Sequence, residues 1–315
     1  MYFSYFGGFT LDVISSTAFG LEVDSLNNPD NPFIKHVQEI FSPPKGIPWK
    51  RFTFLAASMF PSLCGIMKYF EINFWPRESI RFFVRECKAM VEDRRKETRS
   101  QTDFLQLMIN SEAEDTSETQ NGVKSQTTTL QKRLTTDEII GQAFLFFIAG
   151  YETTASLLRF TAYELAIHQD VQEKVVKEIN DKLGDEEPNY ENINKLQYLE
   201  QVLFETLRLF PPLSRLNRAV SEDISIKGMT FPKGSAVFIP VTRIHHDPEF
   251  YPNPEEFNPE RFEDSKSVQN KFIFMPFGLG PRMCIGMRLA LVEAKIALVH
   301  VLRRIKFDKS PNTEV

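Results

Sequence analysis

The chain has 315 residues, of which 42% are hydrophobic and 25% are charged. This composition predicts a globular protein with a large buried core, organised as two domains or as one large domain. The net charge of −5 argues against a nucleic-acid-binding protein, because such proteins present basic surfaces to phosphate groups.

Cysteine usage and the first residues bear on the compartment. Cys64, Cys87 and Cys284 are odd in number and far apart, and no Asn-x-Ser/Thr acceptor occurs, which is typical of a reducing compartment facing the cytosol. The first residues lack a basic region and Asp12 interrupts the apolar run, so we expect no signal peptide and no transmembrane helix. Residues 52–67 are uncharged, and a dip into a membrane surface and a buried helix or loop both remain open for them.

Hydrophobic periodicity predicts the first helices. Apolar residues recur at helical spacing over residues 11–19 and 33–41, and a third helix begins after Pro76. Residues 110–133 are rich in Ser, Thr, Glu and Gln, and we expect a mobile surface connection there. The third helix carries one apolar stripe, formed by Ile80, Phe83, Val84, Cys87 and Val91.

The longest predicted helix covers residues 137–168. Thr135 and Glu138 open it as a capping box, in which each side chain satisfies a backbone N–H group of the other residue. Residues 139–148 are apolar on nearly every side, so we expect this half to be buried all round in the centre of the protein. The apolar run is too short to cross a bilayer.

The second half of the chain mixes helices with a small sheet. Alternating residues predict short strands over 224–231, with a turn at Lys227-Gly228, and over 236–239. Four prolines exclude regular structure over most of residues 245–262, which we expect to be an ordered meander, and a strand starts at 305–307. The predicted helices cover residues 170–183, 194–210 and 286–304.

A glycine-rich loop precedes the last helix. Residues 277–286 read Phe-Gly-Leu-Gly-Pro-Arg-Met-Cys-Ile-Gly, and Gly278 and Gly280 permit a turn that residues with a β-carbon resist. Free N–H groups at the helix start favour a thiolate on Cys284. The alternative is a buried structural cysteine. The surrounding residues argue against this alternative, because five residues at these spacings would rarely occur together by chance. They are Phe277, Gly280, Arg282, Cys284 and Gly286.

Glu205 and Arg208 lie three residues apart on one face of the helix over 194–210. Such a pair is usually a solvated surface bridge, but the flanking leucines bury this helix. A buried ion pair needs further hydrogen bonds, and Arg261 is a plausible third member. We therefore expect a structural role for the three residues.

Residues 149–154, Ala-Gly-Tyr-Glu-Thr-Thr, interrupt the apolar face of the longest helix. The alternative is a helix that emerges into solvent. Gly150 costs about 1 kcal/mol relative to alanine, so we expect the local loosening to have a use. A threonine that bonds back to the helix can widen it and hold a water molecule.

Two competing motifs are weaker. Gly278-Leu-Gly280 hints at a phosphate-binding loop, but the third glycine is missing and Pro281 removes a donor. His245 and His246 suggest metal ligation, but adjacent histidines rarely face one ion and no partner cluster is evident. A packed or capping histidine fits better.

In combination, these motifs resemble those of cytochrome P450 enzymes, and the similarity extends over residues 11–307. The likeness is greatest to family 3, subfamily A. The resemblance implies a mainly α fold with a small β-sheet region, one partial domain over residues 1–315 that is incomplete at both ends. From the resemblance we expect that the N-terminal anchor, the first helices and the C-terminal hairpin of the family lie outside this chain. The segments that carry the likeness to the subfamily are 24–29, 103–108, 149–154 and 284–288.

The resemblance implies a haem b cofactor with a thiolate as the axial ligand of the iron, which favours cleavage of the O–O bond of dioxygen. Cys284 is the expected metal ligand. Phe277 is expected to pack beside the sulfur, and Arg282 and Arg218 to bind haem propionates. The expected cofactor contacts are Cys284, Arg282, Arg218, Phe277, Gly286 and Ala149.

The resemblance also assigns the other site residues. Thr153 and Glu152 are the expected catalytic residues, which steady oxygen and relay protons to it. Glu205, Arg208 and Arg261 would form a structural clamp behind the haem. The expected substrate pocket contains Ile148, Leu213 and Ser214.

The implied activity is a monooxygenase that inserts one atom of O2 into lipophilic substrates such as steroids or drugs. The implied partners are an NADPH-dependent reductase and cytochrome b5, on the cytosolic face of the endoplasmic reticulum membrane. One alternative is a haem-thiolate isomerase or synthase that rearranges lipid peroxides without external electrons. Another is a truncated, inactive haem-binding product.

Overall fold

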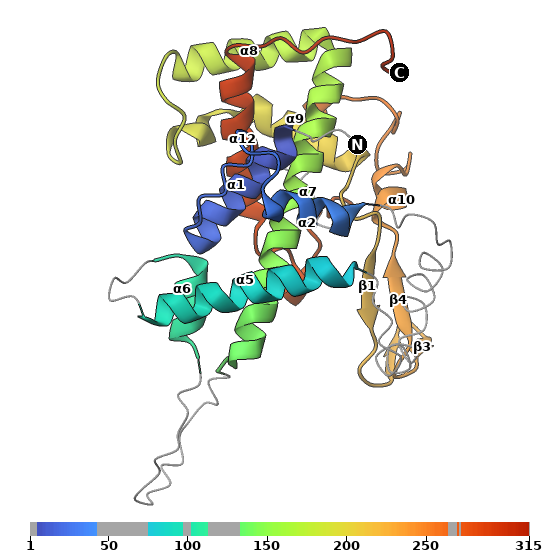
Figure 1. Cartoon of the computed structure of the whole chain (residues 1–315). Coiled ribbons are helices and arrows are strands. Elements are labelled where there is room, and N and C mark those ends of the chain that lie inside the picture. The colour runs from blue at the N-terminus through green and yellow to red at the C-terminus, as the bar shows by residue number, and fades with distance from the viewer. Residues whose placement is uncertain are drawn as a thin grey trace, which may run out of the picture. The chain divides into compact units, whose positions relative to one another are not determined.

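The computed structural model of the chain describes residues 5–42, 75–96, 102–112, 133–263, 270 and 272–314. Helices dominate these residues, and two small antiparallel sheets accompany them, so the predicted mainly α fold is confirmed (Figure 1). The chain divides into two compact units. Within the described residues, unit 1 ends at Glu152 and unit 2 begins at Thr153, so helix α7, Thr136–Ile167, contributes to both.

Unit 1 is built from helices around an aromatic core. The stacked rings of Phe19 and Phe147 lie 4.1 Å apart between centroids, and the Phe83 ring lies 5.8 Å from that of Phe147. Helix α2 packs on α5, and α6 packs on both α1 and α5. The two predicted helices over 11–19 and 33–41 are confirmed, although the first begins earlier. Besides the first half of α7, the described helices of unit 1 are α1 Tyr5–Phe19, α2 Pro32–Phe41, α5 Arg77–Lys96 and α6 Phe104–Asn110.

Helix α5 buries every fourth residue, so its apolar stripe differs from the predicted one at Val84, which is 41% exposed. Each residue turns a helix by about 100°, and Val84 therefore points away from the face that Phe83 occupies. Ser79 is the polar residue on the buried face of this helix. Its hydroxyl donates to Glu39 Oε2 at 2.6 Å and lies 3.1 Å from His36 Nδ1, which satisfies the polar group inside the unit.

Helix α7 begins with the predicted capping box. Thr135 N–H donates to Glu138 Oε2 at 2.9 Å, and Glu138 N–H donates to Thr135 Oγ1 at 3.2 Å. The expectation that the first half is buried all round is wrong, because Leu145 is 50% exposed. An apolar helix does not require burial on every side, since exposed leucines are common on protein surfaces.

Two predictions fall outside the described residues. The connection predicted over 110–133 is described only at residues 110–112 and 133, and the uncharged stretch over 52–67 is not described. Among the described helices, none combines the length and the apolar composition that crossing a bilayer requires.

Helix α9 is the centre of unit 2, because α8, α10, α12 and the short helix η2 all pack on it. The predicted helices over 170–183 and 286–304 are confirmed within a few residues. The helix predicted over 194–210 is two elements, since the backbone of Leu196 leaves the helical region at φ −84° and ψ 84°. Besides the second half of α7, the described helices of unit 2 are α8 Gln169–Leu183, η1 Asn192–Lys195, α9 Gln197–Leu209, α10 Val241–His245, η2 Pro259–Phe262, η3 Gly280–Arg282 and α12 Met287–Leu302.

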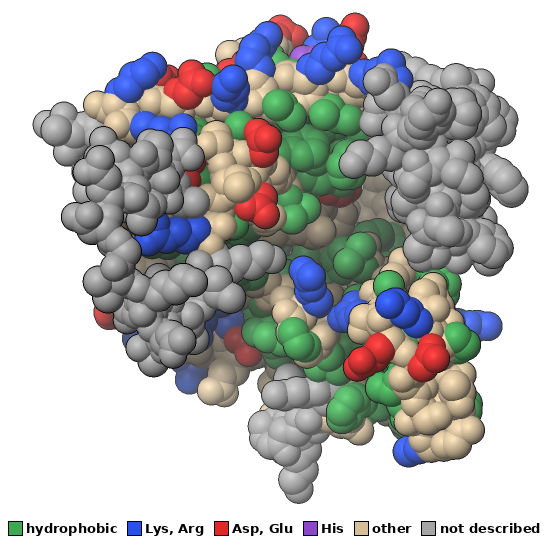
Figure 2. Space-filling model, turned by 90° about the horizontal axis from the view of Figure 1, so that it is seen from below, with side chains coloured by type: hydrophobic (Ala, Val, Ile, Leu, Met, Phe, Trp, Pro, Cys, Tyr) green, Lys and Arg blue, Asp and Glu red, His purple; other side chains and the backbone are tan. Residues whose placement is uncertain are grey.

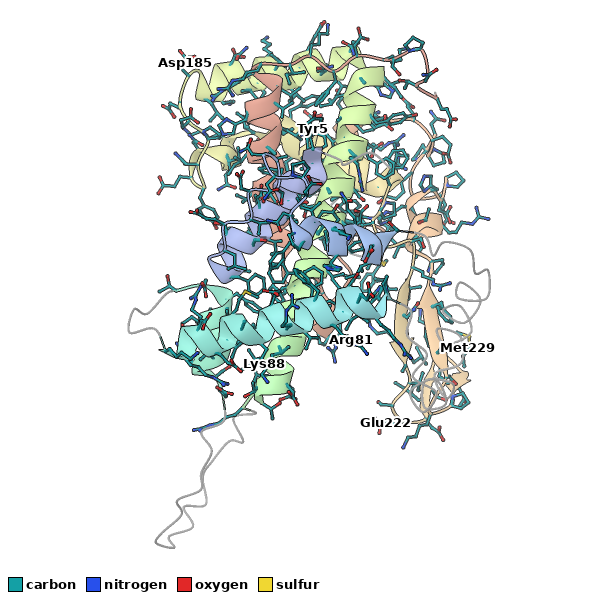
Figure 3. The ribbon with its side chains drawn as sticks, viewed as in Figure 1. Tyr5, Arg81, Lys88, Asp185, Glu222 and Met229 are labelled. Atoms are coloured by element: carbon teal, nitrogen blue, oxygen red, sulfur yellow. The ribbon has the colours of Figure 1, made fainter. Side chains whose placement is uncertain are left out.

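The strands in the described part of unit 2 form two antiparallel pairs. Strand β2, Ile224–Ile226, pairs with β3, Met229–Phe231, through the predicted turn at Lys227-Gly228, where both residues have positive φ. Strand β4, Ala236–Ile239, pairs with β1, Leu216–Ala219, which the sequence analysis missed (Figure 1). Glu222, just before β2, and Met229 are exposed (Figure 3). Exposed hydrophobic side chains lie among charged ones on the face drawn in Figure 2.

Residues 246–258 form the predicted meander, with Tyr251 and Phe257 buried. The strand predicted over 305–307 is wrong. The backbone of Phe307 bonds instead to the amide of Gln172, which accepts from Phe307 N–H at 2.8 Å and donates to its carbonyl at 3.0 Å. A side chain here takes the place of a neighbouring strand.

Candidate active site

Cys284 lies exposed in unit 2, between η3 and α12. Its backbone N–H donates to the carbonyl of Phe277 at 2.8 Å, which closes the loop. Gly278 and Gly280 have φ of +74° and +76°, a region that residues with a β-carbon rarely adopt. The glycine turn predicted from the sequence is therefore present, and it holds the cysteine backbone in place.

The surroundings of the sulfur are open and apolar. A β-carbon at Gly286 would lie 4.0 Å from Cys284 Sγ, so the glycine leaves room beside the thiol. Met283 and Ile285 are exposed, Ile285 by 83%. Exposed apolar side chains on both sides of a thiol suit a ligand that covers them.

Strand β1 lies beside this loop and contributes a cation. Arg218 donates to Leu279 O at 3.3 Å and to Asn217 O at 2.9 Å. Arg282 is exposed at the end of η3. Two guanidinium groups thus accompany the cysteine loop, and each has the planar fork of donors that recognises carboxylates.

Arg208 and Glu205 form an ion pair on α9 that is fully shielded from solvent. Arg208 Nε donates to Glu205 Oε2 at 2.7 Å, and Nη2 donates to Oε1 at 2.8 Å. The remaining three N–H groups donate to backbone carbonyls, so all five donors of the guanidinium group are used. The three carbonyls belong to His245, Pro254 and Glu256.

Arg261 joins this pair, because its Nε lies 3.3 Å from Glu205 Oε1. The same oxygen accepts from the backbone N–H of Asn258 at 3.0 Å. Glu205 therefore faces two arginines and one amide, which offset the cost of burying its charge. The structure brings together the three residues of the predicted clamp. Their hydrogen bonds connect the meander to α9.

His245 is a packed histidine. Its Nδ1 lies 3.2 Å from Arg208 O, and Met275 N–H donates to its Nε2 at 3.0 Å. Both contacts are satisfied by the neutral ring with its proton on Nδ1. Burial lowers the pKa of His245 to about 4. No group of three or more His, Cys, Asp or Glu side chains suited to a metal ion occurs in the described ranges.

The predicted oxygen-activation segment lies on α7. Glu152 is half-buried, and Ala149 and Thr153 are exposed. Ile148, predicted to line the substrate pocket, belongs to the hydrophobic core of unit 1. Gly150 packs tightly, since a β-carbon there would lie 2.6 Å from Ile14 Cγ1.

The other two residues predicted for the pocket, Leu213 and Ser214, are exposed in unit 2 between α9 and β1. The carbonyl of Ser214 accepts from Thr242 N–H at 3.2 Å, which fixes this segment to α10. The predicted site residues therefore come from both units: Ile148, Ala149 and Glu152 from unit 1, and the remainder from unit 2.

Comparison with known proteins identifies the family. The family model described as "Cytochrome P450" matches residues 2–315. The chain belongs to the cytochrome P450 family. Similar P450 proteins include human cytochrome P450 3A7, 43% identical over 313 residues, mouse cytochrome P450 3A13, 41% identical over 318 residues, and human cytochrome P450 3A5, 40% identical over 316 residues.

Each of these alignments covers 98% of this chain and 59% of the relative. The chain thus spans about three fifths of the length of these P450 relatives. The names of these relatives, all P450 3A proteins, agree with the likeness to family 3, subfamily A, that the motifs showed.

P450 membership implies haem b with thiolate-ligated iron, and the residues of the cysteine loop fit that group. The thiol is exposed, its neighbours are apolar, and two arginines accompany the loop. Cys87 does not fit, because it is fully buried and burial raises the pKa of its thiol to about 12.

One pair of titratable residues was missed from the sequence. Glu164 is buried on α7, and its Oε2 lies 3.1 Å from Nδ1 of His168. Burial, and to a smaller extent the carboxylate of Glu205, raise the pKa of Glu164 to about 7. The spacing of four between a glutamate and a histidine on a predicted helix was the available signal.

Proposed function

We propose that this P450 is a haem-thiolate monooxygenase that inserts one atom of O2 into a lipophilic substrate and releases the other as water. The observation that carries the proposal is the exposed thiol of Cys284, held by the hydrogen bond between its N–H and Phe277 O and by two glycines with positive φ. When bound through a thiolate, haem supplies the activation of dioxygen.

Cys284 provides the metal ligand in this proposal. The loop fixes its backbone before any cofactor binds, which lowers the entropy that binding must overcome. Arg218 and Arg282 would bind the carboxylates of the cofactor, Phe277 and Gly286 would pack beside the sulfur, and Ala149 is the proposed cofactor contact on α7.

Thr153 and Glu152 are the residues proposed to deliver protons. In this proposal the hydroxyl of Thr153, an exposed residue, would steady oxygen by a hydrogen bond, and the carboxyl of Glu152, a half-buried residue, would relay protons to it. Leu213 and Ser214, which are exposed in unit 2, are the proposed substrate contacts, and a steroid-like or drug-like compound is the proposed class of substrate. Ile148 was predicted to join them, but the structure buries it in the core of unit 1.

Glu205, Arg208 and Arg261 act as a structural clamp. The carbonyls that Arg208 binds come from α10 and the meander, and the cysteine loop follows these segments in the sequence. An NADPH-dependent reductase and cytochrome b5 are the proposed electron donors, at the cytosolic face of the endoplasmic reticulum membrane.

Carbon monoxide added to the reduced, haem-loaded protein tests the proposal. Thiolate ligation gives a red-shifted Soret band. Cys284→Ser should abolish this band, whereas Cys87→Ala, which changes the buried cysteine, should retain it. A wild-type protein without this band contradicts the haem-thiolate assignment. Turnover of a lipid peroxide without NADPH, together with no turnover of NADPH and O2, would instead favour the isomerase.

A further inference from the structure

Helix α1 contacts α7 through a buried hydroxyl. Thr10 is fully buried, and its Oγ1 donates to the carbonyl of Tyr151 at 2.9 Å, with the carbonyl of Gly7 in its own helix at 3.1 Å. Tyr151 immediately precedes Glu152. The bond therefore reaches α7 at the turn that carries both residues proposed to move protons.

The packing on both sides keeps this bond in place. Ile14, one turn after Thr10, fills the space beside Gly150 so closely that a β-carbon would lie 2.6 Å from its Cγ1. One turn before Thr10, a β-carbon on Gly7 would lie 3.0 Å from the Tyr151 hydroxyl oxygen. Because neither contact leaves space for sliding, the hydroxyl of Thr10 meets the Tyr151 carbonyl in a fixed position.

A helix carbonyl that accepts a second hydrogen bond weakens its helical one. In a regular α-helix the Tyr151 carbonyl accepts from the N–H of Ala155, and an added hydroxyl donor draws the oxygen outward and lengthens that bond. The turn from Tyr151 to Ala155 contains Glu152 and Thr153. A longer bond at this turn would change where their side chains point.

We propose that Thr10 is a positioning residue for oxygen activation, acting through the Tyr151 carbonyl to hold open the α7 turn that carries Glu152 and Thr153. The inference rests on the proposed monooxygenase function. Neither the motif at 149–154 nor the family's cysteine loop contains Thr10, and the residue acts from a different helix.

Hydrogen exchange of the Ala155 amide in the haem-loaded protein tests the proposal independently of turnover. Thr10→Val removes the hydroxyl at nearly constant volume, so the Tyr151 carbonyl returns to Ala155. We expect exchange at Ala155 to slow by about two- to ten-fold, the range of one ordinary hydrogen bond. A merely structural role predicts the opposite, since loss of a stabilising contact accelerates exchange along α7. Unchanged or faster exchange at Ala155 overturns the proposal.

Two further variants complete the experiment. Thr10→Ser keeps the hydroxyl and should restore wild-type exchange, and Thr17→Val removes a hydroxyl that bonds only within α1, to Val13 O at 2.6 Å, and should leave Ala155 unchanged. In turnover, Thr10→Val should release more hydrogen peroxide per NADPH than Thr10→Ser, with the carbon monoxide band intact in both. Absence of that band in wild type refutes the proposed function, whereas equal peroxide release with the band present refutes only the role of Thr10.

Discussion

Ile14 and Gly150 fit together so closely that the space for a β-carbon on Gly150 lies 2.6 Å from Ile14 Cγ1 and 2.9 Å from its Cδ1. The glycine in the middle of α7 is thus required by the neighbouring helix. Glycine has a lower helix propensity than alanine, and the close approach of α1 offsets this cost.

Gly150→Ala should destabilise the protein by about 1–3 kcal/mol, because overpacking outweighs the gain in helix propensity. Gly141→Ala is the matched control on the same helix, since nothing lies within 4 Å of its added β-carbon. It should stabilise by up to about 1 kcal/mol. Urea unfolding of both variants measures the difference, and equal effects would contradict the close fit. Ile14→Ala combined with Gly150→Ala should cost less than the sum of the single changes.

Arg208→Ala should destabilise the protein by about 3–5 kcal/mol, because it leaves the buried carboxylate of Glu205 short of its closest cation. Lys174→Ala removes an exposed ion pair with Glu260 and should cost less than about 1 kcal/mol. Chemical denaturation compares the two. A small effect of Arg208→Ala would mean that Arg261 alone can neutralise Glu205.

His245 should make the fold sensitive to acid. Burial lowers its pKa to about 4 in the folded protein, below the ordinary value of 6.5. Between these values the unfolded chain binds a proton that the folded protein does not, so the free energy of unfolding falls as the pH drops from 6.5 toward 4, by up to about 1.4 kcal/mol per pH unit. The NMR titration of the His245 ring tests this directly, and a midpoint near 6.5 would contradict it.

Glu293 should change the free energy of unfolding with pH in the opposite direction to His245. It is buried on α12, its Oε1 has no hydrogen-bond partner among the described residues, and burial raises its pKa to about 8 from 4.5. Between these values the folded protein holds a proton that the unfolded chain has lost, so stability falls as the pH rises from 4.5 to 8. Glu293→Gln should remove this slope. The comparison is cleanest between pH 6.5 and 8, where His245 no longer contributes, and parallel stability curves for the two proteins would contradict it.

The periodic parts of the fold were readable from the sequence. Residues 170–183 alternate charged and apolar positions at helical spacing, and α8 follows that pattern because its packing depends on local sequence. The glycines of the cysteine loop were readable for the same reason, since a positive φ is a local requirement.

What the sequence analysis missed depends on distant partners. Strand β1 is recognisable only through its pairing with β4, and residues 305–307 lost their predicted strand because Gln172 bonds to Phe307. Thr10 resembles any threonine inside a helix until the carbonyl of Tyr151 is placed beside it. The motifs predicted the chemistry, whereas the contacts that position it came from the structure.

The contacts of His245 have a consequence for the cysteine loop. The ring joins the end of α9, at Arg208 O, to Met275 N–H, and Gly278 N–H in turn donates to Met275 O. An uncharged imidazole therefore connects the helix of the ion pair to the first turn of the loop. A proton added at Nε2 would set two N–H donors against each other, so acid would weaken the connection between α9 and the loop.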